Sequence, residues 1–262
     1  MYPTLPKSYK GLYPFKLCTT SYIYPDHMVP NVEMLAPYLD EIEILFFEST
    51  ADSLPSKQDI KQLALLAHEF DLTYNVHLPL DIYPGAVDPK VRHSALEIVK
   101  QIMDLTAPLS PSTFTLHLPY EGTDLKKSSV KPWQNRLYDS MSQLIANGIS
   151  GERISIENLD YPLAWVDNIL NDFNLSVCLD LGHLMVNRID LEDVFNRYRE
   201  KTTIIHLHGV KNDRDHLSLD RLSRENREVV ILILKQFEGI VSLEVFSFQN
   251  LLASLNELEN YE

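Results

Sequence analysis

Eight short apolar runs, each followed by a longer segment, organise almost the whole chain. The intervening segments place apolar residues at the three- and four-residue spacing of a half-buried helix, as in Ile60, Leu63, Ala67 and Phe70. Regular strand–helix alternation is typical of parallel sheets. Eight units favour closure into an α/β fold, the (β/α)8 TIM barrel, over an open doubly wound sheet. The runs are Phe15–Ser21, Glu41–Phe47, Thr73–Leu78, Thr113–Leu118, Arg153–Ile156, Leu175–Leu179, Thr202–Leu207 and Ile240–Val245.

Local signals mark where the helices should begin. Asp88 followed by Pro89 is typical of an N-cap and a proline in the first helical position. Pro132 is expected to start another helix in the same way. No linker, low-complexity tract or repeat divides the chain, so we expect residues 1–262 to form one domain, with 1–14 as an N-terminal extension. Further helices are expected at Leu163–Phe173, Asp190–Arg199, Arg221–Phe237 and Phe248–Leu258.

Composition restricts the partners. The chain has 37 Asp and Glu against 23 Lys and Arg, a net charge of -14. Nucleic-acid affinity draws heavily on cationic groups that replace counterions on phosphates, so a small-molecule substrate is expected instead. Cys18 and Cys178 each fall within an expected strand, where a buried free thiol is the usual state. The absence of a signal peptide and of a long apolar span predicts a cytoplasmic protein with no membrane contact.

Histidines and acids recur at the carboxyl ends of the expected strands, where barrel enzymes hold their active sites. Six of the nine histidines lie there, and His27, His68 and His93 are expected at the surface. Asp180 and His183 are close enough in sequence for a turn to bring both to one centre. The full set is His77, His117, Glu157, Asp180, His183, His206, His208, His216 and Glu244.

Histidine and carboxylate together suit Zn, Mn, Fe or Co. Carboxylates also bridge ions, and paired ions about 4 Å apart clamp the two oxygens of a phosphoryl displacement. A single buried histidine is more often only hydrogen-bonded in place, and a strand-end acid more often caps a helix. Burying so many such groups together is costly unless counter-charges are present. We therefore expect two or three divalent metal ions.

The order of these residues resembles the endonuclease IV and xylose isomerase-like barrel superfamily, from about Phe15 to Phe246. In the endonuclease branch, successive strands supply His, His, Glu, Asp-x-x-His, His, a loop Asp-x-His and a final Glu. Arg214 occupies the position of the loop Asp, so Asp213 or Asp215 substitutes, or that ligand is absent. The order leaves His208 as a candidate substrate contact. The resemblance implies the metal ligands His77, His117, Glu157, Asp180, His183, His206, His216 and Glu244.

A closer resemblance, to cobamide-remodelling phosphodiesterases, rests on residues 17–26 (LCTTSYIYPD), residues 40–49 (DEIEILFFES) and the HLPL motif at 77–80. It implies hydrolysis of the nucleotide-loop phosphodiester of a cobamide, which gives cobinamide phosphate and an α-riboside. Candidate catalytic carboxylates are Glu157, Glu244 and Glu48, the last expected at the end of the second strand. A corrin ring is broad and largely uncharged, so aromatic contacts are expected from Tyr22 and Tyr120, with Tyr24, Phe46, Phe47, Tyr83 and Phe246 as further candidates.

Three other functions stay open. A sugar isomerase or epimerase would hold one Mn and has no need of the histidine pair His77 and His117. A non-catalytic corrinoid-binding protein would retain a metal site without turnover. An abasic-site endonuclease would cut duplex DNA. The number of ions bound per chain separates the epimerase from the multi-metal hydrolase.

Overall fold

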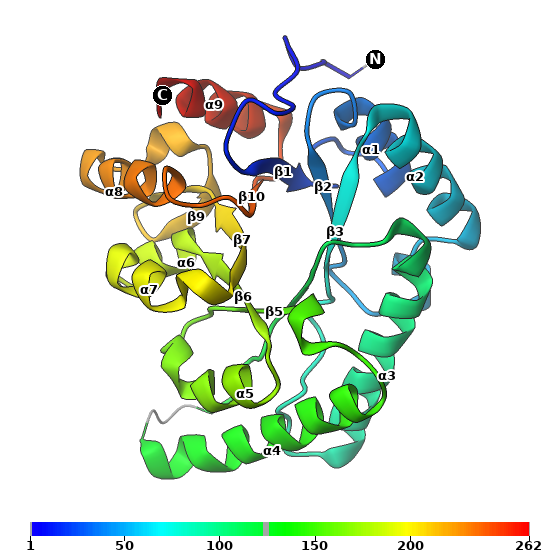
Figure 1. Cartoon of the computed structure of the whole chain (residues 1–262), viewed down its shortest axis with the longest axis vertical. Coiled ribbons are helices and arrows are strands. Elements are labelled where there is room, and N and C mark those ends of the chain that lie inside the picture. The colour runs from blue at the N-terminus through cyan, green and yellow to red at the C-terminus, as the bar shows by residue number, and fades with distance from the viewer. Residues whose placement is uncertain (1, 123–125, 262) are drawn as a thin grey trace.

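Eight parallel strands close into a barrel in the computed structural model, which describes residues 2–122 and 126–261 (Figure 1). Their order around the barrel follows the chain, and the last strand pairs with the first, for example through Leu243 and Thr19. The predicted (β/α)8 barrel is therefore confirmed. The barrel strands are β1 (Lys16–Thr20), β2 (Glu41–Leu45), β3 (Thr73–His77), β4 (Phe114–Leu116), β5 (Ile154–Glu157), β6 (Ser176–Asp180), β7 (Thr202–Leu207) and β10 (Ile240–Leu243).

Helices surround this barrel (Figure 1). Asp88 caps α3 and Pro89 begins it, as predicted. The prediction for Pro132 is wrong, because α4 begins at Lys127 and the proline lies inside it. The helix continues past the proline, because burial of Trp133 on its apolar face offsets the cost of a proline inside the helix. The helices are α1 (Met28–Leu35), α2 (Lys57–Phe70), α3 (Pro89–Thr106), α4 (Lys127–Ala146), α5 (Asp167–Asp172), α6 (Leu181–Val186), α7 (Leu191–Tyr198), α8 (Arg224–Leu234) and α9 (Phe248–Leu258).

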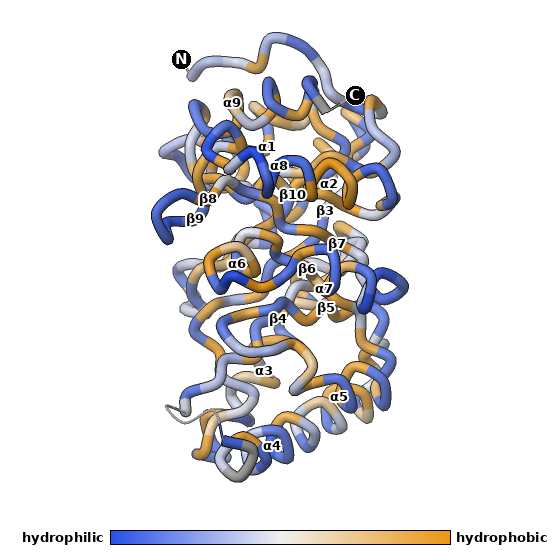
Figure 2. Tube along the Cα trace, turned by 90° about the vertical axis from the view of Figure 1, so that its left-hand side faces the viewer, coloured by the Kyte–Doolittle hydropathy of each residue, from blue (hydrophilic) through white to orange (hydrophobic). Residues whose placement is uncertain are grey.

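A short antiparallel hairpin that the sequence patterns did not predict follows β7. It consists of β8 (Gly209–Lys211) and β9 (Arg214–Leu217). Asn212 and Asp213 form its turn with positive φ angles, which these residue types tolerate better than most. Figure 2 shows the hairpin as a hydrophilic projection from the side of the molecule. Its second strand carries His216 back towards the barrel.

The two faces of the barrel strands differ sharply. Side chains such as Ile42 and Ile44 point outwards into the main apolar core beneath the helices. The interior of a TIM barrel is usually filled by branched aliphatic side chains. Here the interior apolar cluster is small, and buried polar side chains take much of the remaining space. The small cluster consists of Cys18, Cys178, Ile204 and Ile240, and both cysteines are free.

The surface agrees with one further expectation. His27, His68 and His93 are all exposed, as predicted. Among the described residues, none of the helices has the length and apolar character that crossing a bilayer requires.

Candidate metal centre

Glu157, the last residue of β5, lies at the centre of the cluster at the carboxyl ends of the strands. Its Oε2 is 3.2 Å from His77 Nε2 and 3.0 Å from His117 Nε2, and its Oε1 is 3.3 Å from His183 Nδ1. Burial opposes ionisation, but the positive fields of His117 and His206 outweigh it and hold the pKa of Glu157 well below its usual range. The structure therefore brings residues from four strands and α6 around one ionised carboxylate.

Asp180 ends β6 and forms a second grouping. Its Oδ1 accepts the backbone N–H of His183 at 2.6 Å, so it also caps α6. Its Oδ2 lies 3.3 Å from His208 Nε2, while His208 Nδ1 accepts the backbone N–H of His216 at 3.0 Å. His208 is fully buried with both ring nitrogens engaged. In this arrangement it supports Asp180, and its role as a substrate contact stays a prediction.

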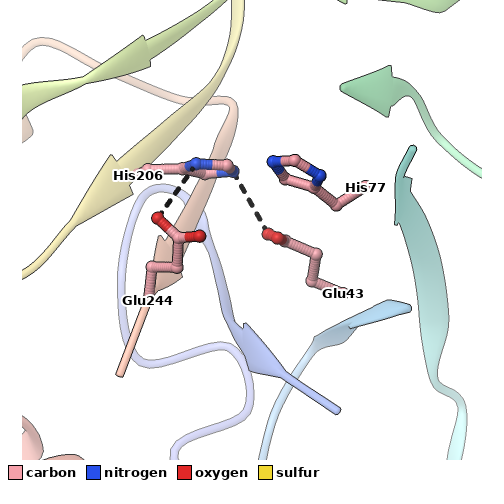
Figure 3. A group of neighbouring side chains, drawn as sticks. All are labelled: Glu43, His77, His206 and Glu244. Atoms are coloured by element: carbon pink, nitrogen blue, oxygen red, sulfur yellow. Dashed lines mark ion pairs between the residues drawn. The ribbon is translucent and has the colours of Figure 1, made fainter. Parts of the chain in front are cut away.

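His206, on β7, differs from His208 in the contacts of its ring. Its Nδ1 lies 3.3 Å from Glu244 Oε2 and 3.5 Å from Glu157 Oε2, and its Nε2 lies 3.3 Å from Glu43 Oε2 (Figure 3). Among the described residues, neither ring nitrogen has a hydrogen-bond partner. His206 therefore has both ring nitrogens without hydrogen bonds, whereas those of His208 are engaged, and His206 as the ligand stays a prediction.

Glu43 is a residue of this cluster that sequence reasoning missed. It is fully buried and points into the barrel from β2. The available signal was the alternation Glu41-Ile42-Glu43-Ile44, which places both acids on the face opposite the two isoleucines. Glu48, the predicted strand-end carboxylate, is exposed, because β2 already ends at Leu45.

The two loop aspartates differ in their distance from the cluster. Asp213 is 73% exposed and faces Arg188 at 3.9 Å. Asp215 belongs instead to a group with His183 and His216 in which the ligand atoms lie within 4.8 Å of one another. His216 is held by its Nδ1, which lies 3.1 Å from the backbone oxygen of Glu244. Of the two aspartates left open by the sequence, the structure places Asp215 at the cluster.

Aromatic side chains extend from the cluster to a neighbouring cavity of about 840 Å³. The ring of Phe246 is 5.2 Å from that of His216 and 5.9 Å from that of Phe47, which in turn is 5.0 Å from Tyr22. Tyr22 thus lines the cavity as expected. Tyr120 does not line it and packs against two tryptophans, Phe46 is buried in the core, and Tyr83 is only half-buried.

The donor set fits divalent metal ions. Ligand atoms about 2.0–2.2 Å from a tetrahedral ion lie about 3.3 Å apart, which matches the 3.0–3.5 Å between the histidine nitrogens and carboxylate oxygens above. Several buried donor atoms have no hydrogen-bond partner among the described residues, which leaves them free for an ion. They include both carboxylate oxygens of Glu43, His117 Nε2, both ring nitrogens of His206, and Glu244 Oε2.

Without ions, the histidines supply the positive charge. Burial lowers the pKa of His183, but Asp180 and Glu157 outweigh it and raise the pKa to about 9. A raised pKa stabilises the metal-free fold most fully below the ordinary pKa of about 6.5, and this contribution is lost as pH rises towards 9. Protons therefore compete with metal ions at neutral pH, so metal affinity should rise with pH.

Because Gly182 has no side chain, the ring of His208 can occupy the space beside it. A Cβ at this position would lie 1.9 Å from His208 Cε1, so the buried ring would have to move. Gly182→Ala is therefore expected to release Asp180 and to weaken metal affinity about 10- to 100-fold, the usual effect of losing an outer-sphere support. Competition with a chromophoric chelator measures this. Glu192→Ala, at an exposed position on α7, should retain wild-type affinity; equal affinity in both variants would contradict the prediction.

Comparison with known proteins agrees with this fold. The family model for the xylose isomerase-like TIM barrel matches residues 39–261. A D-tagatose 3-epimerase-like protein superposes with a TM-score of 0.78 at 19% identity, over 94% of this chain and 97% of that one. Endonuclease IV from Thermus thermophilus gives a TM-score of 0.69 at 16% identity, over 94% and 99% of the two chains.

A further structure, that of the IOLI protein with a bound zinc atom, gives a TM-score of 0.70 at 16% identity, over 94% of this chain and 96% of that one. No curated protein sequence matches the chain. These identities are low enough that the solved structures support the fold alone. The family model covers most of the sequence, and the chain belongs to the xylose isomerase-like TIM barrel family.

Proposed function

We propose that this chain is a metal-dependent phosphodiesterase that hydrolyses the nucleotide-loop phosphodiester of cobamides to cobinamide phosphate and an α-riboside. The observation that carries the proposal is the pair His77 and His117, which face one carboxylate oxygen of Glu157 at 3.2 and 3.0 Å. This pair adds an ion position beside the one that Glu157 forms with the acids and histidine of the later strands. A phosphodiester reaction uses such neighbouring positions, whereas a single-metal reaction does not need them.

Three neighbouring positions would hold the ions. Two or three ions of Zn, Mn, Fe or Co would neutralise charge on the phosphodiester oxygens and lower the pKa of water. Glu157 would bridge the first two positions. The first would use His77, His117 and Glu157, the second Glu157, Asp180, His206 and Glu244, and the third His183, Asp215 and His216.

The chain's own residues supply the remaining chemistry. Glu244 lies at the barrel mouth with 6% of its surface exposed. Burial opposes its ionisation, but His206 outweighs it and lowers the pKa of Glu244, so the carboxylate is anionic. The lowered pKa weakens Glu244 as a base, and it is the position at the barrel mouth that supports its role in accepting the proton of the attacking water. The water oxygen bonds to phosphorus, the bond from phosphorus to the ribosyl oxygen breaks, and the phosphate stays with the cobinamide. The released ribosyl oxygen takes up a proton.

The cavity beside the centre supports a large and weakly charged substrate. Its aromatic lining, which includes Tyr22, Phe47 and Phe246, suits the faces and edges of a corrin macrocycle. The net charge of -14 disfavours duplex DNA, whose binding depends on cationic side chains. A corrinoid therefore fits this surface better than a nucleic acid does.

Incubation of the metal-loaded protein with an adenosylated cobamide is expected to yield cobinamide phosphate. His117→Ala should reduce turnover by about 10³-fold, since one ion position contributes several kcal/mol to the transition state. His93→Ala, an exposed histidine on α3, is the matched control and should leave turnover unchanged. Chromatography of the corrinoid products measures both. The proposal fails if Mn, Zn, Fe and Co all give no product.

A sugar isomerase or epimerase is the second candidate. The superposition on a D-tagatose 3-epimerase-like protein, at a TM-score of 0.78, favours it. Such an enzyme would need one ion, held by Glu157, Asp180, His206 and Glu244. In that case His117→Ala would retain activity on a ketose, and the wild-type chain would bind a single ion. Cutting of an abasic duplex would point instead to the activity that the Thermus thermophilus structure is named for.

A further inference from the structure

We propose that Glu43 is an additional metal ligand, and that together with His77, His206 and Glu244 it holds a divalent cation deep inside the barrel. This residue lies outside the eight ligands that the endonuclease resemblance implies. The inference rests on the metal binding in the proposed function but is independent of the phosphodiesterase activity. It concerns the layer of the barrel interior below Glu157.

Two glutamates of β2 point into the barrel, and only one of them is satisfied. Glu41 is fully buried, and its Oε1 accepts hydrogen bonds from Ser112 at 2.5 Å and Asn75 at 3.0 Å. Its Oε2 accepts from Thr73 at 2.5 Å and from the Lys16 ammonium at 3.4 Å. Glu43 is equally buried, yet neither of its oxygens has a hydrogen-bond partner among the described residues. A buried carboxylate in this state needs a positive charge, which protonated His206 at 3.3 Å supplies in the metal-free protein and which an ion would supply when bound.

The surroundings of Glu43 supply the other ligands. Figure 3 shows Glu43, His77, His206 and Glu244 pointing towards one another from β2, β3, β7 and the end of β10. One ligand atom from each lies within 4.8 Å of the others, and all four residues are buried. His206 Nδ1 lies 3.3 Å from an oxygen of Glu244, but one imidazole offers a single nitrogen to any one ion, and it is His206 Nε2 that lies 3.3 Å from an oxygen of Glu43. Two ligands of one tetrahedral ion at about 2.0–2.2 Å have this separation.

His77 can serve this ion only through Nε2, the nitrogen that also faces Glu157 in the first ion position, so the two positions compete for one donor. His77 Nδ1 lies 2.8 Å from the backbone oxygen of Leu78, so this nitrogen is the donor and Nε2 is the acceptor in the neutral ring. Two imidazoles and two carboxylates form a donor set that suits Zn, Mn, Fe or Co.

A purely positioning role for Glu43 fits less well. A carboxylate that orients a metal-bound histidine accepts the N–H of the outer ring nitrogen. Glu43 Oε2 is close to His206 Nε2, but the ring N–H does not point at it, and neither ring nitrogen makes a hydrogen bond among the residues described. The position of Glu43 therefore favours direct coordination of an ion.

Glu43→Gln tests the proposal, because it keeps the side-chain shape and removes the charge. Each protein is saturated with Zn or Mn, dialysed and measured by elemental analysis, with circular dichroism as the check on folding. Glu43→Gln is expected to retain one ion per chain fewer than the wild type. Glu238→Gln, an exposed position before β10, should retain the full number. An unchanged number in Glu43→Gln overturns the proposal, and a lower affinity with the same number assigns a positioning role instead.

Anomalous diffraction from Zn- or Mn-soaked crystals of the wild type provides a second test that needs no variant. A peak about 2.2 Å from a Glu43 oxygen and bonded to His206 is expected. Ions around Glu157 with none at Glu43 would overturn this inference and leave the proposed function intact. A chain that binds no ion anywhere would overturn both.

Discussion

Glu157→Gln is expected to remove most of the bound metal and to reduce turnover by at least about 10³-fold. The carboxylate faces His77, His117, His183 and His206 at 3.0–3.5 Å, so in the proposed function it belongs to two ion positions. The amide of glutamine carries no charge to offset an ion or a protonated histidine. Loss of several kcal/mol of electrostatic stabilisation in the transition state corresponds to a decrease of this size.

Elemental analysis and cobamide turnover, measured on the same preparations, check this prediction. Glu238→Gln makes the same chemical change at an exposed site just before β10 and should behave as the wild type. A Glu157→Gln protein with the wild-type number of ions would show that the carboxylate is not a bridging ligand. A protein that kept its ions and lost only turnover would assign Glu157 to the reaction instead.

Removal of the metal is expected to lower the melting temperature by about 5–10 °C. A ligand at 100 times its Kd stabilises the folded state by about 2.7 kcal/mol, and each kcal/mol shifts the melting temperature of a chain this size by about 2–4 °C. The buried oxygens of Glu43 and the ring nitrogens of His206 make no hydrogen bonds among the described residues, which makes the metal-free interior costly. Differential scanning calorimetry before and after chelation, and again after addition of Zn or Mn, measures the shift.

The shift should also depend on pH. The pKa of His183 is about 9 in the metal-free state, so its proton opposes metal binding more strongly at pH 6 than at pH 8. The difference in melting temperature should therefore be larger at pH 8. His206→Ala removes a ligand and serves as the control, with a smaller shift at both values. Identical melting curves with and without metal in the wild type would contradict ion binding at this centre.

The Glu43 proposal and these predictions share one physical basis, which is the cost of buried charge. Glu41 shows how the barrel satisfies a buried acid with protein donors alone. Glu43, two residues further along the same strand, has no such donors among the residues described. The contrast between the two makes an ion the simplest source of compensation, and the measured number of ions decides it.

The sequence by itself determined the architecture and the end of the barrel at which the centre lies. Eight strand–helix units encode a closed parallel sheet through local periodicity, and α9 forms over Phe248–Leu258 as that periodicity predicts. Histidines and acids placed where strands end must meet at one mouth, because parallel strands all finish there. The sequence positions of His77, His117 and Glu157 therefore predict that these side chains meet, and in the structure they do.

Only the tertiary structure decided the role of individual side chains. His206 and His208 both belong to one short sequence, but His208 is engaged by Asp180 from another strand and by the hairpin backbone, while His206 is left free. Glu43 rather than Glu48 faces the centre, because β2 ends earlier than its apolar pattern suggested. These outcomes depend on partners distant in the chain, and local spacing carries no information about which of two nearby groups such a partner will bind.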